Sequence, residues 1–224
     1  MPIYKTKNEN FFKTWTADMA YILGFFCADG AMTINPRGSK YIDFTITDLN
    51  LLEKRRDYLG SNHKIKIRPG NGRGVKNRYR LQIGSKVIFQ DLLNLGITPN
   101  KTFRMKLPKM PNEYFLDFVR GYFDGDGNVW SGPTHKDRKT PNLSLRTSFT
   151  SGNKNFLQAL AEKLNKNYKI HGSLIFREKA YRLTYSNAGS LFLYKFMYNN
   201  ANIYLERKKI VFERYLNLYN AVVA

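Results

Sequence analysis

The chain has 224 residues, 42% of them hydrophobic and 15% aromatic, which is typical of a folded globular protein and not of a disordered one. With 37 Lys and Arg against 17 Asp and Glu, the net charge is +20, which indicates a polyanionic partner. No apolar run approaches the ~20 residues that span a bilayer, no signal peptide follows Met1, and the single cysteine excludes an internal disulfide. We expect an intracellular protein of a bacterial cytoplasm or an organelle matrix, not secreted and with no membrane partner.

The first predicted element is a buried helix over residues 21–30, with the sequence YILGFFCADG. Gly30 suits the end of this helix, but Asp29 places a carboxylate in the last turn, where the helix dipole is already negative. A compensating cation is therefore expected nearby. Gly24 and Ala28 are four residues apart and form a strip of small side chains that would let a second helix approach closely.

Amphipathic strands and helices follow. Residues 41–47 alternate apolar and polar side chains, as in a half-buried strand, and residues 48–60 have apolar residues at helical spacing. Residues 63–83 then form the clearest hairpin, in which Lys and Arg alternate with apolar residues about a Pro-Gly turn. A helix over residues 85–95 closes this half, and the prolines in residues 106–112 indicate a short, stiff linker.

The same order of elements then repeats. VRGYFDGDG (residues 119–127) matches ILGFFCADG (residues 22–30), so that Asp126 repeats Asp29, and Gly121 and Gly125 repeat the strip of small residues. The elements expected in the second half are a strand over 143–150, a helix over 152–164, a weaker strand pair within 168–186, and helices over 187–199 and 205–221.

This repeat predicts an α+β fold of two similar αββαββα halves. Each half would contain an antiparallel sheet, and the halves would join through the helices that carry the repeated stretches. The expected boundaries are residues 1–105 for the first half, 106–112 for the linker and 113–224 for the second half.

The two repeated carboxylates predict a metal site. If the duplicated helices pack side by side, Asp29 and Asp126 meet at their C-terminal ends, where two like charges are unfavourable unless they are neutralised. Mg²⁺ takes one or two protein carboxylates together with phosphate oxygens and water. A cation of this kind activates water for in-line displacement at phosphorus, so a divalent metal and a phosphate ester are the predicted ligands.

The two stretches resemble the LAGLIDADG motif of homing endonucleases, and the doubled repeat is similar to that of the single-chain, pseudo-symmetric members of that family. The resemblance covers roughly residues 15–220. It implies that the two halves are related by a pseudo-twofold axis and that each presents its antiparallel sheet as a saddle for DNA. It implies that Asp29 and Asp126, with Ala28 and Gly125, lie at the metal site, which takes Mg²⁺ or Mn²⁺ for cleavage and Ca²⁺ for binding alone. The acidic sixth position of the motif is Asp124 in the second copy and Cys27 in the first, and we interpret this position as structural.

Further site residues follow from the resemblance. Asp48 and Ser151 are expected to hold matching places after the second strand of each half and to order solvent, although Asp48 also suits the N-cap of the next helix. Lys101 and Lys208 are expected at the active site, with Lys209 as an adjacent alternative to Lys208.

The basic strand faces and the turns beside them predict the surface that contacts DNA. A two-stranded ribbon fits the major groove, where Arg, Lys and Gln read base edges. The candidates in the first half are Arg37, Lys40, Lys64, Lys66, Arg68, Arg73, Lys76, Arg78, Arg80 and Gln82, and those in the second half are Lys136, Arg138, Lys139, Arg146, Lys169, His171, Arg177, Arg182 and Thr184.

The function predicted from these features is that of a monomeric, intron-encoded homing endonuclease. Such an enzyme hydrolyses one phosphodiester per strand of double-stranded DNA at a long, asymmetric, pseudo-palindromic target. Two alternatives would use the same basic surface: a maturase that binds its host intron RNA, and a sequence-specific DNA-binding protein that has lost catalysis. Retention of Asp29 and Asp126 argues against the inactive protein.

Overall fold

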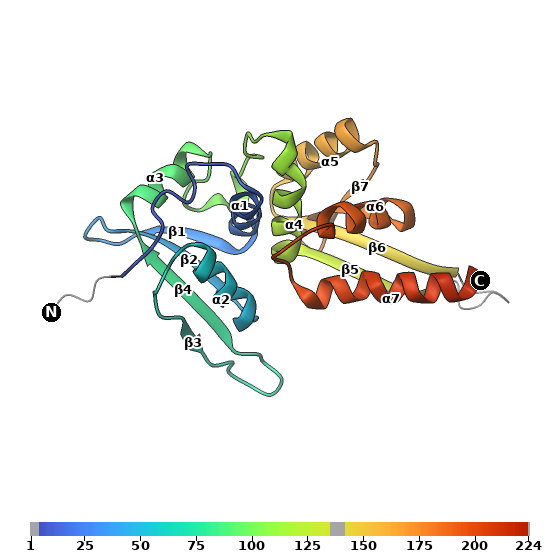
Figure 1. Cartoon of the computed structure of the whole chain (residues 1–224), viewed down its shortest axis with the longest axis horizontal. Helices are drawn as coiled ribbons and strands as arrows, with labels where there is room; N and C mark the ends of the chain where they lie inside the picture. The colour runs from blue at the N-terminus through green and yellow to red at the C-terminus, as the bar shows by residue number, and fades with distance from the viewer. Residues whose placement is uncertain (1–4, 135–141, 224) are drawn as a thin grey trace. The chain divides into compact units, whose positions relative to one another are not determined.

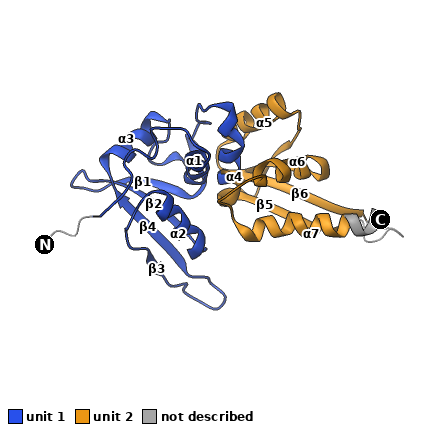
Figure 2. Ribbon diagram, viewed as in Figure 1, with its two compact units in different colours: residues 1–121 blue, residues 122–224 orange. Residues whose placement is uncertain are grey.

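A computed structural model describes residues 5–134 and 142–223 (Figure 1). The chain forms two compact units, residues 1–121 and residues 122–224, whose boundary falls inside one helix, α4 (Phe115–Asp126) (Figure 2). Each unit contains a four-stranded antiparallel sheet and several helices, which confirms the predicted α+β class. None of the helices in these described ranges has the length and apolar character needed to cross a bilayer.

The core of unit 1 is built around α1 (Ala17–Asp29). The Thr16 side chain begins this helix by accepting a hydrogen bond from the Met19 N–H at 3.1 Å. Every residue from Met19 to Cys27 is buried, so this helix is apolar on all sides, as expected for a core element. The helix ends where Gly30 turns into extended backbone and begins the first strand.

The sheet of unit 1 has the strand order β1-β2-β4-β3, and every neighbouring pair is antiparallel (Figure 1). The helices that follow β2 and β4 begin at polar caps, because the side chains of Asp48 and Ser85 accept hydrogen bonds from backbone N–H groups in their first turns. The elements after α1 are β1 (Gly30–Ile34), β2 (Lys40–Ile46), α2 (Leu49–Tyr58), β3 (Lys66–Arg68), β4 (Arg78–Gly84), α3 (Lys86–Asn94), and the 3₁₀ turns η1 (Lys101–Phe103) and η2 (Asn112–Tyr114).

Strand alternation divides this sheet into an apolar face and a polar face, as predicted. Ile42 and Phe44 of β2 are fully buried on the side that α1 and α2 cover. The register pairs Asp43 with Gln82 and Thr45 with Arg80, so polar side chains of neighbouring strands share the other face. We call this opposite side the polar face of the unit 1 sheet.

Unit 2 repeats the same arrangement with strand order β5-β6-β8-β7. The register identifies equivalent positions, since Gly30 pairs with Phe44 in unit 1 and Gly127 pairs with Phe149 in unit 2. The additional helix α7 packs against β5 and β6. The elements of unit 2 after α4 are β5 (Gly127–Thr134), β6 (Asn142–Ser151), α5 (Lys154–Tyr168), β7 (Ser173–Arg177), β8 (Ala180–Ser186), α6 (Asn187–Tyr198) and α7 (Glu206–Val223).

The first turns of α4 belong to unit 1 and pack against α1. The Arg120 guanidinium lies 5.2 Å from the centre of the Tyr21 ring and forms an ion pair with Asp117 at 2.8 Å. A Cβ atom added to Gly121 would lie 2.8 Å from the carbonyl carbon of Tyr21 and 2.9 Å from the backbone nitrogen of Phe25. Gly121 therefore allows a backbone-to-backbone approach that no other residue permits. The predicted linker, residues 106–112, also lies within unit 1.

Substitution of Gly121 by alanine is expected to destabilise the protein strongly. The new methyl group meets backbone atoms of α1, which cannot move aside as a flexible side chain could, and we expect a loss of about 3 kcal/mol in the free energy of unfolding. Urea denaturation of the full chain measures this loss.

The matched control is Gly189→Ala in α6, where the nearest atoms are in the Tyr185 side chain at 3.3 Å. We expect this second substitution to change the free energy by less than ~1 kcal/mol, because a side chain can adjust and alanine favours a helix. Equal losses in the two variants would show that the contact between α4 and α1 has no special role.

Candidate active site and nucleic-acid face

The C-terminal end of α1 carries a carboxylate and receives a cation. Asp29 is the last residue of the helix, and its side chain is exposed. Lys101 lies in η1, and its Nζ donates a hydrogen bond to the Ala28 carbonyl oxygen at 3.3 Å. The lysine charge thus lies at the negative end of the helix dipole, where it offsets the unfavourable position of Asp29.

The end of α4 in unit 2 receives a cation in a tighter arrangement. Lys208 is only 3% exposed, and its Nζ donates to the carbonyl oxygens of Phe123, Asp124 and Gly127 at 2.5, 3.0 and 2.6 Å. An ammonium group has three N–H donors, so three backbone carbonyls account for all of them. Lys208 therefore acts as a cap for the C-terminal end of α4, next to Asp126.

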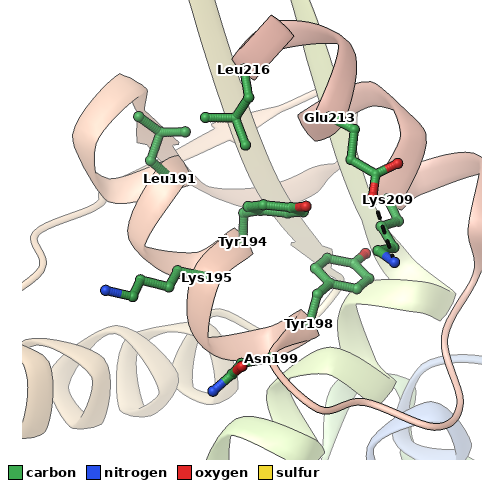
Figure 3. A pocket seen from close by; sticks show the side chains of 8 residues that line it. All are labelled: Leu191, Tyr194, Lys195, Tyr198, Asn199, Lys209, Glu213 and Leu216. Carbon is green, nitrogen blue, oxygen red and sulfur yellow. Dashed lines mark ion pairs between the residues drawn. The ribbon is translucent and has the colours of Figure 1, made fainter. Parts of the chain in front are cut away.

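Lys209 lies elsewhere, although it neighbours Lys208 in the sequence. Its ammonium group lies 4.6 Å from the centre of the Tyr204 ring and forms an ion pair with Glu213 at 3.5 Å. With Tyr194 and Tyr198 it lines a pocket of about 530 Å³ between α6 and α7 (Figure 3). Of the two adjacent lysines, Lys208 is the one that reaches the end of the motif helix.

The sixth motif position differs between the units for a structural reason. Asp124 is 2% exposed, and its Oδ2 accepts a hydrogen bond from the Leu205 N–H at 2.8 Å, just before α7 begins. In unit 1 the lysine lies in the short turn η1 and not in a long helix, and Cys27 occupies the buried position equivalent to Asp124. Burial raises the pKa of the Cys27 thiol to about 12, so this side chain is an apolar space-filler and not a nucleophile.

The expected match between Asp48 and Ser151 is wrong. Phe44 and Phe149 occupy equivalent positions in the two registers, so the counterpart of Ser151 is Ile46 and that of Asp48 is Asn153. Asp48 caps α2 through the Leu51 N–H, and Asn153 caps α5 through the Phe156 N–H, at 2.9 and 3.3 Å. The Ser151 Oγ accepts a hydrogen bond from the Asn153 N–H at 3.1 Å. The predicted pairing was displaced by two residues, because alternation along a strand does not reveal which residues of the two halves are equivalent.

The donor chemistry at these helix ends fits a hard divalent cation. Asp29 supplies an exposed carboxylate beside the Ala28 carbonyl, and oxygen ligands of this kind suit Mg²⁺. Asp126 and Gly125 occupy the equivalent place in unit 2 and are half-buried. The described residues contain no group of three or more His, Cys, Asp and Glu side chains arranged to hold a metal. A shared site formed by Asp29 and Asp126 involves both units and remains a prediction, as does an interface of Gly24 and Ala28 with Gly125.

The polar face of the unit 1 sheet carries several of the predicted DNA contacts. Lys66 pairs with Arg80, and Arg68 pairs with Arg78, so these four side chains share one face with Gln82. Lys64 precedes β3, and Arg37, Arg73 and Lys76 lie in exposed turns.

Lys40, predicted as a DNA contact from the turn before β2, does not share this polar face. Lys40 belongs to the opposite face, where its Nζ lies 5.1 Å from the centre of the Phe89 ring of α3. It begins β2 directly after a turn, and the alternation of that strand turns its side chain to the helix layer.

The polar face of the unit 2 sheet is hollowed into a groove of about 640 Å³. Arg146, Arg177, Arg182 and Thr184 line it, as predicted for residues of the strand face, and sequence reasoning missed the exposed Trp130 and Ile175 among them. The sequence could have indicated both residues, because each is a large apolar side chain at a strand position that alternation directs outward.

Two second-half candidates do not belong to this face. Lys169 is the C-cap of α5, with a left-handed φ of 58°, and His171 lines a hollow with Glu162 and Asn165 of that helix. Both residues precede β7, so strand alternation does not apply to them. The remaining candidates, Lys136, Arg138 and Lys139, lie outside the described residues.

Two units with the order helix, two strands, helix, two strands and helix, each with a carboxylate at the end of its first helix, define the LAGLIDADG class of fold. Residues 16–95 match the family model of the LAGLIDADG-like domain. The DNA-directed RNA polymerase subunit Rpo1C of Methanocaldococcus jannaschii is 28% identical over 148 residues. That match covers 64% of this chain but only 15% of the polymerase subunit.

Solved structures share this fold over most of the chain. The LAGLIDADG meganuclease I-AabMI bound to uncleaved DNA has a TM-score of 0.63 at 13% identity, covering 93% of this chain and 91% of that one. The homing endonuclease I-LtrWI bound to target DNA has a TM-score of 0.61 at 13% identity, covering 96% and 91%. I-DmoI in complex with DNA and Mn has a TM-score of 0.54 at 16% identity, covering 87% and 100%. The chain thus contains a LAGLIDADG-like domain and has the fold of LAGLIDADG homing endonucleases.

Loss of the Lys208 ammonium is expected to destabilise the protein far more than loss of the Lys101 ammonium. Lys208→Met leaves three buried carbonyls without their donor, which should lower the free energy of unfolding by about 3 kcal/mol. Lys101→Met removes a hydrogen bond of 3.3 Å, longer than those of Lys208, from a half-buried ammonium group. It should lower the free energy of unfolding by ~1 kcal/mol. Urea denaturation of the two full-length variants compares them, and similar losses would contradict the capping role of Lys208.

Cys27 is expected to resist alkylation in the folded protein. Its raised pKa keeps the thiol protonated at pH 8, with a thiolate fraction on the order of 10⁻⁴, and burial also blocks the reagent. Mass spectrometry after iodoacetamide treatment should show an unmodified native chain and a single adduct after denaturation in guanidinium chloride. Rapid modification of the native chain would show that the end of α1 opens in solution.

Proposed function

We propose that this protein is a homing endonuclease that cuts both strands of double-stranded DNA at one specific site. The observation that supports this most directly is the polar face of each sheet, where Lys, Arg and Gln side chains in unit 1 and Arg side chains in unit 2 lie on the side opposite the helices. Antiparallel strands fit the major groove, and these are the side chains that contact base edges and phosphates there. DNA is also the ligand in the solved structures of I-AabMI and I-LtrWI, which have the same fold.

The target proposed for this enzyme is asymmetric. The polar face of unit 1 has Lys66, Arg68 and Arg78 on neighbouring strands, whereas the groove of unit 2 includes Trp130 and Ile175 at outward positions. Faces with different donors and different apolar groups recognise different bases, so the two half-sites should differ in sequence. One chain carries both motifs, and we propose that it acts as a monomer encoded within an intron.

The chemistry proposed for the site is hydrolysis assisted by a divalent cation. Asp29 and Asp126 would bind Mg²⁺ through their carboxylates, with Mn²⁺ as a substitute and Ca²⁺ supporting binding alone. A bound metal supplies Lewis acidity toward the phosphate and a lowered pKa for water. I-DmoI has been solved with DNA and Mn. Lys208 holds the end of α4, and Lys101, which is less buried, holds the end of α1.

Replacement of either motif aspartate is expected to abolish double-strand cleavage and to preserve binding. Duplexes are first selected from a randomised pool by the wild-type protein in Ca²⁺, and the selected duplex is then incubated with Mg²⁺. We expect Asp29→Asn and Asp126→Asn to bind this duplex in Ca²⁺ and to leave it uncut in both strands, because each removes a metal-binding charge.

The control is Asp57→Asn, an exposed acid on α2, which should cut like the wild type. Cleavage by both motif variants would contradict the proposed roles of Asp29 and Asp126. A folded motif variant that no longer binds would also contradict a catalytic role. If the wild type leaves the selected DNA uncut and instead promotes splicing of its host intron RNA, the protein is a maturase and the proposed activity is wrong.

A further inference from the structure

Asp43 is a buried acid on the polar face of the unit 1 sheet. Its side chain is 6% exposed, and the other charged side chains on the described strands of this face are Lys and Arg. A buried carboxylate in a surface that attracts DNA reduces the attraction for phosphates, so its presence requires another explanation. Its position between Ile42 and Phe44 in β2 was visible in the sequence, but its partners were not.

The two carboxylate oxygens of Asp43 have separate partners. Oδ1 accepts a hydrogen bond from Nε of Arg80 at 2.6 Å and forms an ion pair with Nη2 of the same group at 2.5 Å. Oδ2 accepts from the Thr33 hydroxyl at 3.2 Å and from Nε2 of Gln82 at 3.3 Å. Asp43 thus links three strands, and it holds two side chains whose amide and guanidinium groups are typical readers of bases.

The Arg80 contact selects one edge of the guanidinium group. The edge formed by Nε and Nη2 is occupied by Asp43, which leaves the edge formed by Nη1 and Nη2 for a ligand. That second edge has two parallel N–H donors, the arrangement that pairs with O6 and N7 of guanine. Holding the group in one orientation also lowers the entropy lost when it binds.

The Gln82 contact fixes the orientation of an amide. Since an ionised carboxylate accepts hydrogen bonds only, the NH₂ group of Gln82 must face Asp43 and its carbonyl oxygen must point away. The second N–H and the carbonyl oxygen are then presented together. This pair is complementary to N7 and N6 of adenine in the major groove.

We propose that Asp43 is a positioning residue for base recognition, which presents Arg80 to a guanine and Gln82 to an adenine in one half of the target. The proposal deepens the proposed function and rests on it. Asp43 contacts no base itself but fixes the two residues that do. It lowers the affinity for DNA of any sequence while raising the discrimination between sequences.

The unit 2 sheet has no carboxylate at the position equivalent to Asp43, so the two units of one chain can be compared. Ser148 occupies the position equivalent to Asp43, because each pairs with the residue that follows the motif glycine, Ala31 in unit 1 and Asn128 in unit 2. Arg182 is equivalent to Arg80, and its carboxylate partner is Glu178, at 2.5 Å. Glu178 belongs to the turn between β7 and β8, has a left-handed φ of 54°, and is 61% exposed. An exposed ion pair of this kind orients its arginine weakly.

The test compares Asp43→Ser with Glu178→Ser in the full-length protein. Each variant removes one carboxylate that bonds to an arginine at equivalent strand positions, so each raises the net charge by the same amount. Serine is already present at this position of the unit 2 sheet. Wild-type protein first selects its site from a randomised pool of duplexes in Ca²⁺, and Arg80→Ala and Gln82→Ala then identify the base pairs that these residues read.

The expected results separate charge from positioning. Both serine variants should make the salt dependence of binding steeper by about 0.9 in logarithmic slope, because each removes one negative charge that is paired with arginine, at Arg80 in unit 1 and at Arg177 and Arg182 in unit 2. A mismatch at the guanine or adenine pair should weaken wild-type binding about tenfold, but should weaken Asp43→Ser binding by less than about threefold. Glu178→Ser should retain the wild-type penalty at both pairs.

An unchanged mismatch penalty in folded Asp43→Ser overturns the proposal, and so does the absence of a guanine at the pair assigned to Arg80. If thermal melting shows that Asp43→Ser is not folded, the isosteric variant Asp43→Asn gives the same comparison. Its mismatch penalty is expected to lie between that of the wild type and the limit of about threefold given for Asp43→Ser. A wild-type protein that selects no sequence from the pool contradicts the proposed function instead. The two failures are therefore distinguishable.

Discussion

Both units depend on a solution to the same problem, the end of a buried helix that carries a carboxylate. The last carbonyls of such a helix need hydrogen-bond donors, and the carboxylate lies at the negative end of the dipole. In each unit a lysine from a distant segment supplies both the donor and the charge. Lys101 lies 73 residues beyond its partner Ala28, and Lys208 lies 85 residues beyond Phe123. These contacts attach the last segment of each unit to its first helix.

The helix end also determines how the sheet is presented. Gly30 and Gly127 begin the first strand of each sheet directly after the carboxylates Asp29 and Asp126, with no intervening loop. The carboxylate therefore lies at the start of an edge strand, because β1 and β5 are the outermost strands of their sheets. Once the first strand is placed, antiparallel pairing and alternation direct the polar residues of the other strands to one face.

Local periodicity was sufficient to predict most of the fold. Alternation identified β2, β4 and β6, apolar spacing identified the helices, and the repeated glycines and aspartates identified the two halves. Local periodicity did not specify the face of side chains that lie beyond the strands, as with Lys169 and His171, or directly at a turn, as with Lys40. It also failed where register decides which residues are equivalent, as with Asp48 and Ser151. The partners of Asp43 and Lys208 come from segments far apart in sequence, which no local pattern specifies.

The contrast between Asp43 and Glu178 has a consequence for how such a protein evolves. The carboxylate that holds Arg80 is buried and shared by three strands, so changing it alters several side chains at once. The carboxylate that holds Arg182 lies in a surface turn, where substitutions are usually tolerated with little loss of stability. Single substitutions should therefore change the outward face of the unit 2 sheet one side chain at a time, whereas a change at Asp43 alters several side chains of the unit 1 face together.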